Sequence, residues 1–109
     1  MYIGDCTFKK WHCKIDLKFY SNGRKAIVLS DKESEEPIAT ATVNIPQATL
    51  PDDRNYCFIK NWSENDGVLQ SLQEAKIIGE ILAFYPTGYA EAMLVKILVD
   101  TTKELTDES

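Results

Sequence analysis

The sequence predicts an α+β fold, in which a mostly antiparallel sheet of about six strands carries one helix packed on one face. Residues 11–20 alternate strictly between apolar and polar side chains, which is typical of a half-buried strand. A helical period replaces this alternation at about 64–77, and the segment 89–99 is apolar on both faces, as in a central strand. The resulting order, ββββ-α-ββ, is characteristic of the α+β class.

The first two strands are expected to form a hairpin. The strand at 11–20 runs into an Asn-Gly pair at 22–23, and 25–30 forms the return strand. Asn-Gly favours a two-residue type I′ turn, because both central positions of that turn need a positive φ. Such a turn would place Leu17 opposite Val28.

The remaining elements follow in order along the chain. Strands are predicted at 38–45, 56–60, 80–85 and 89–99. Ser63 supplies a cap at the start of the helix, with the acidic residue Asp66 three positions later. Gly79 fits the position just beyond the C-terminus of the helix. We expect one domain over 1–99 and a polar tail at 100–109.

Composition limits the class of protein. The chain has 109 residues, 44% of them hydrophobic, which is enough for a core without disulfides or metals. Its three cysteines lack paired spacing, the opening segment lacks the pattern of a signal peptide, and no apolar run is long enough to span a membrane. We therefore expect a cytoplasmic protein that does not enter membranes.

No motif indicates an enzyme, a metal site or a cofactor. The single histidine, His12, alternates with Cys13 onto the opposite strand face, so the two do not converge on one metal ion. Neither a nucleophile elbow nor a phosphate-binding glycine loop occurs. We predict no catalytic, cofactor-binding or metal-ligating residues, although an enzyme with a dispersed site remains a third alternative.

Charge is segregated along the chain. Residues 1–30 carry six basic and two acidic side chains, whereas 31–109 carry six basic and fifteen acidic ones, for a net charge of −5. Such segregation steers encounters with charged partners. The basic residues on the first hairpin could bind a nucleic-acid backbone, which is our alternative function; they are Lys10, Lys14, Lys18, Arg24 and Lys25.

The acidic residues support the leading hypothesis, a surface that binds a protein. Spaced carboxylates can imitate a phosphate backbone, and aromatic side chains at an exposed turn can anchor an interface. The candidate residues are Glu33, Glu35, Glu36, Asp52, Asp53, Tyr85 and Tyr89. A homodimer built on an exposed sheet edge would be compatible with either function.

Three stretches are distinctive: NGRKAI at 22–27, IATATVNIP at 38–46 and IKNWSENDG at 59–67. Together they resemble a family of small uncharacterised proteins carried by bacterial integrative and conjugative elements and by phages. The resemblance implies an accessory protein of a mobile element that acts on host machinery or host defence. It implies no catalytic residues. The partner expected is therefore a host protein, in particular one that handles nucleic acid.

Overall fold

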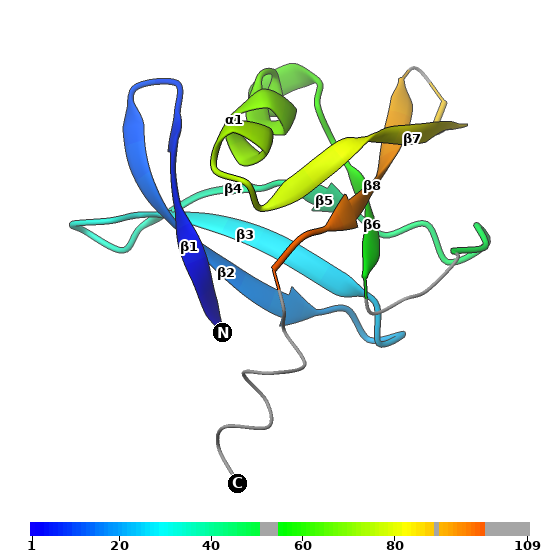
Figure 1. Cartoon of the computed structure of the whole chain (residues 1–109), viewed down its shortest axis with the longest axis horizontal. Coiled ribbons are helices and arrows are strands. Elements are labelled where there is room, and N and C mark those ends of the chain that lie inside the picture. The colour runs from blue at the N-terminus through cyan, green and yellow to red at the C-terminus, as the bar shows by residue number, and fades with distance from the viewer. Residues whose placement is uncertain (51–54, 89, 100–109) are drawn as a thin grey trace, which may run out of the picture.

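The chain folds into two antiparallel sheets with one short helix (Figure 1). The computed structural model describes residues 1–50, 55–88 and 90–99. Sheet A has the strand order β1-β2-β3-β4 and sheet B the order β5-β6-β8-β7. The elements are β1 (Tyr2–Phe8), β2 (Trp11–Phe19), β3 (Lys25–Asp31), β4 (Pro37–Thr40), β5 (Thr42–Val43), β6 (Tyr56–Ile59), the 3₁₀ turn η1 (Ser63–Asn65), α1 (Val68–Glu74), β7 (Ile78–Pro86) and β8 (Glu91–Ile97).

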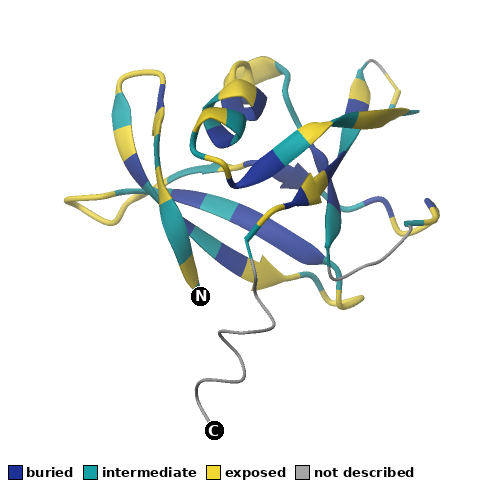
Figure 2. Cartoon of the chain, viewed as in Figure 1, coloured by how far each residue is buried: buried dark blue, intermediate teal, exposed yellow. Residues whose placement is uncertain are grey.

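The main core lies where the two sheets and α1 meet. Ile15 and Leu29 from sheet A, Ile59 and Val95 from sheet B, and Leu72 from α1 are all fully buried in it. Burying each such side chain is worth about 1.5–3 kcal/mol, so this cluster supplies most of the driving force for folding. Figure 2 shows the buried residues along β2 and β3 and on one side of α1, with exposed residues at the loops.

Sheet B is apolar on both faces. Its outer face carries a second cluster, in which Phe58 and Ala92 pack against Ile45 and Ala48. The chain after β5 therefore covers the face of sheet B that the main core does not use. The predicted central position of the last strand is confirmed, because β8 lies between β6 and β7.

The α+β class with mostly antiparallel strands and one helix is confirmed, but the single six-stranded sheet is wrong. The predicted strand 38–45 divides at Ala41, with β4 in sheet A and β5 in sheet B. The backbone N–H of Ala41 donates to Ile27 O at 2.8 Å, and its carbonyl accepts from Lys60 N at 2.8 Å. Ala41 therefore connects the two sheets. The β-branched pattern of residues 38–45 predicts a strand but does not indicate that its two halves pair with strands of different sheets.

The strand β1 was not predicted from the sequence. Tyr2–Phe8 shows no clean alternation, and pairing with β2 is what holds it extended. Its pairing also shifts between Tyr2 and Gly4, where φ of Gly4 is 150°. A bulged edge strand of this kind is stabilised by its neighbour more than by its own pattern.

The hairpin register also differs from the prediction, since Leu17 lies opposite Ile27 and not Val28. The loop has three residues: Tyr20 N donates to Arg24 O at 2.8 Å, and Gly23 N donates to Tyr20 O at 2.9 Å. Gly23 alone takes the left-handed conformation at the end of the turn, with φ 86°. This is the three-residue loop with a glycine bulge, and it moves the register by one residue.

The helix is shorter than the predicted 64–77. Gly67 has φ 94°, which separates η1 from α1. The side-chain oxygen of Asn61 caps α1 by accepting from Gly67 N at 3.1 Å and from Leu69 N at 3.0 Å. The left-handed residue after the helix is Lys76, with φ 62°, whereas Gly79 already belongs to β7.

Candidate protein-interaction surface

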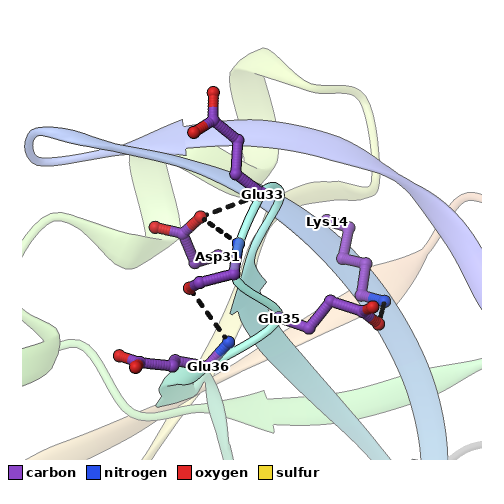
Figure 3. Close-up of polar contacts among 6 residues, drawn as sticks. Lys14, Asp31, Glu33, Glu35 and Glu36 are labelled. Carbon is purple, nitrogen blue, oxygen red and sulfur yellow. Dashed lines mark hydrogen bonds and ion pairs between the residues drawn. The ribbon is translucent and has the colours of Figure 1, made fainter.

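The connection between β3 and β4 forms an ordered acidic loop, residues 31–36. The Oδ1 atom of Asp31 accepts from Glu33 N at 2.8 Å and from Ser34 N at 3.1 Å. Asp31 N donates to Glu36 O at 2.8 Å, and Glu35 N donates to Asp31 O at 2.9 Å. These bonds, of which those of the Asp31 side chain are drawn in Figure 3, close the loop on itself and support its shape.

The three predicted glutamates of this loop have different surroundings. Glu35 pairs with Lys14 at 2.6 Å, and this hydrogen bond lowers the pKa of Glu35 and raises that of Lys14. The carboxylates of Glu33 and Glu36 point away from the loop and from each other (Figure 3). Neither takes part in an ion pair among the described residues, so both present full charge to solvent.

Asp31 is the fourth carboxylate of the loop, and its two hydrogen bonds fix its orientation. Hydrogen bonds from the backbone N–H groups of Ser34 and Glu33, together with the nearby charge of His12, lower its pKa. Asp31 is therefore ionised well below neutral pH.

A pocket of about 160 Å³ lies between the acidic loop and the β1–β2 turn. The register of sheet A explains its position, since Asp31 lies opposite Cys13 and therefore next to Trp11 along the same face. The residues that line the pocket are Lys10, Trp11, His12, Asp31 and Glu33. Sequence reasoning assigned no such role to Trp11 or His12, because the loop 31–36 comes to lie beside them only through the pairing of β2 with β3.

The other predicted interaction residues do not extend this surface. Tyr85 is half-buried, and its ring lies 5.8 Å from that of Phe58 in the second core cluster. The turn after β7 lies at the opposite side of the molecule from the acidic loop (Figure 1). Asp52, Asp53 and Tyr89 lie outside the described residues. The described candidates therefore form two separate surfaces.

Three of the five basic residues proposed for nucleic acid are engaged within the protein. The guanidinium of Arg24 donates to the carbonyls of Ile45 at 2.6 Å and Ala48 at 2.5 Å. Lys25 is buried, and Lys14 is paired with Glu35. Lys10 and Lys18 are exposed. The described basic face is therefore smaller than the sequence pattern indicates.

The three cysteines are free thiols. Burial raises the pKa of Cys57 to about 12 and that of half-buried Cys6, which faces Cys13 across β1 and β2, to about 12 as well. Within residues 1–50, 55–88 and 90–99, no three His, Cys, Asp or Glu side chains gather closely enough to hold a metal ion.

Comparison of the chain with protein-family models, with curated proteins and with solved structures finds no match. In the part of the chain that the structure describes, no helix has the length and apolar character needed to cross a membrane.

Proposed function

We propose that the protein is a non-enzymatic interaction protein whose acidic loop binds a basic surface on a protein partner. The observation that carries this proposal is the ordered loop 31–36, which holds Asp31 and directs Glu33 and Glu36 to solvent. A loop whose backbone is already ordered loses little entropy on binding, and its negative charges speed association with an oppositely charged partner.

The partner we propose is a host protein that handles nucleic acid. Such a protein carries a basic channel for phosphates, and spaced carboxylates on a net −5 chain complement that channel. The resemblance of residues 22–27, 38–46 and 59–67 to proteins of mobile elements supports a host target. Direct binding of nucleic acid has less support, because Arg24, Lys25 and Lys14 are used inside the fold.

The test is capture of partners from a nuclease-treated bacterial lysate with tagged protein. The charge-reversed variant E33K/E36K alters the two outward carboxylates and spares Glu35, whose partner is Lys14. The matched control is E80K/E91K, which makes the same charge change at exposed positions of sheet B. Both variants are first checked for native circular dichroism.

We expect a partner that binds the natural protein and the control and binds E33K/E36K about tenfold more weakly, since two interface charges contribute roughly 1.4 kcal/mol together. Affinity should also fall as salt rises. A partner that binds all three proteins alike would contradict the proposal. Recovery of nucleic acid from an untreated lysate, lost with salt, would support the alternative function in its place.

A further inference from the structure

The pocket beside the acidic loop combines an aromatic wall with two carboxylates. Trp11 forms the wall, and its ring also contacts the ring of Phe8, with the two centroids 6.4 Å apart. Asp31 and Glu33 stand on the loop side. A flat aromatic ring beside carboxylates attracts a cation in two ways: through the quadrupole of the ring and through the negative charge of the carboxylates.

The protein already places a cation of its own on this ring. The ammonium of Lys10 lies 5.5 Å from the centroid of Trp11. Lys10 is exposed and sits at the tight β1–β2 turn, so its side chain can leave the ring without disturbing the strands. The ring therefore attracts cations in this setting, and an incoming cationic group would take the position of Lys10.

The charge balance of the pocket also favours a cation. The pocket is lined by two acidic residues, Asp31 and Glu33, and by two basic ones, Lys10 and His12. Lys10 is the group to be displaced, so the carboxylates then outnumber the remaining basic side chain. An anion such as a phosphate would face both carboxylates at close range and would be repelled. His12 completes the rim, with its Nδ1 atom 3.5 Å from Thr7 Oγ1.

We infer that this pocket takes the guanidinium of an arginine side chain on a protein partner, stacked on Trp11 and paired with Asp31 and Glu33. The inference rests on the proposed function, for which it supplies the anchoring contact. Arginine fits better than lysine because its planar group stacks on an aromatic face and donates to carboxylates in a fork. A pocket of about 160 Å³ has room for one such side chain.

The experiment is an NMR titration of the ¹⁵N-labelled protein with the peptide acetyl-Gly-Ser-Arg-Ser-Gly-amide. The same peptide with lysine tests the shape of the cation, and the same peptide with citrulline removes the charge. The chain has two tryptophans, so the indole N–H of Trp62 serves as an internal reference for that of Trp11. A W62F variant assigns the two signals.

The expected result is a saturable shift of the Trp11 indole with the arginine peptide, binding at least threefold weaker with lysine, and no shift with citrulline. The variant E33Q should weaken binding about threefold or more, whereas E80Q, with the same charge change at an exposed position of sheet B, should not. K10A should strengthen binding, because it removes the competing ammonium.

Several results would overturn the inference. Equal weakening by E33Q and E80Q, or equal binding of arginine and lysine, would mean that the acidic protein attracts cations without a pocket, and the proposed function would stand alone. An unmoved Trp11 indole would exclude the pocket as well. Failure of the proposed function is separate: it appears as a partner whose capture is insensitive to E33K/E36K.

Discussion

The guanidinium of Arg24 donates a hydrogen bond of 2.5 Å to the carbonyl of Ala48, in the segment that covers the outer face of sheet B. A second bond of 2.6 Å joins it to the carbonyl of Ile45. Arg24 lies at the end of the β2–β3 turn, so this contact ties sheet A to the covering segment of sheet B. A residue predicted to bind nucleic acid thus holds the fold together.

Replacement of Arg24 by alanine should lower the free energy of unfolding by about 2–3 kcal/mol, because it removes two charge-assisted hydrogen bonds. The Ala48 carbonyl then loses its guanidinium donor, whereas the Ile45 carbonyl still accepts from Ala48 N. R24K should lose less, since it keeps one donor and the charge. Urea denaturation measures both. K18A, at an exposed position on the preceding strand, is the control and should change stability by less than about 0.5 kcal/mol. A stable R24A protein would contradict the assignment.

The cap of α1 provides a second prediction. Asn61 Oδ1 accepts from two backbone N–H groups at the start of the helix, Gly67 N and Leu69 N. N61A should therefore cost about 1 kcal/mol of stability, within the range known for lost caps. N61D retains an acceptor oxygen and should lie close to the natural protein. If N61A and N61D are equally destabilised in urea, the side-chain oxygen is not the cap.

The pH dependence of stability should report the hydrogen bonds to Asp31. Its pKa in the folded protein is lowered, so the stability it contributes is present above its unfolded pKa of about 3.9 and is lost as pH falls through the lower folded value. D31N keeps the acceptor oxygen and removes the titration. Its free energy of unfolding should change less between about pH 4 and pH 2 than that of the natural protein. E36Q is the control, and a D31N curve parallel to it would disprove this reading.

Thiol reactivity should separate the folded from the unfolded chain. Cys57 is buried with a pKa of about 12, Cys13 is fully buried with a raised pKa, and the pKa of Cys6 is also about 12. Because the thiolate is the reactive form, a disulfide reagent at pH 8 should label the native protein slowly and all three thiols rapidly in concentrated urea. C6S identifies the residual native reaction, which we assign to half-buried Cys6. Rapid labelling of Cys57 without denaturant would contradict the packing of sheet B.

The strand interiors were predictable because their side-chain patterns reflect burial directly. The alternation over residues 11–17 and the double apolar character of Glu91–Ile97 each match the sides on which these strands are covered. Phe19 departs from the pattern, because it lies on the predicted buried face but is 58% exposed. The turn was less predictable. Asn-Gly at 22–23 suits both a two-residue and a three-residue loop, and only the pairing of Tyr20 with Arg24 decides between them.

The candidate site was likewise predictable in part from the sequence. The sequence marked Glu33, Glu35 and Glu36 as a cluster, and the structure shows that they share one loop. The sequence could not show that Glu35 pairs with Lys14, because that contact joins residues 21 positions apart. Trp11 was read as a core residue, and it became a pocket wall only through the position of the neighbouring loop.

The sequence by itself determined the class of fold, the position of the helix, the central place of the last strand and the charge of the loop at 31–36. These properties depend on neighbouring residues, whose periodicity and charge are visible without coordinates. Only the tertiary structure decided the division into two sheets at Ala41, the role of Arg24 and the pocket beside Trp11. Each of these depends on contacts between residues distant in the chain. Such contacts form because apolar side chains must be buried while the backbone N–H and C=O groups buried with them still find hydrogen-bond partners.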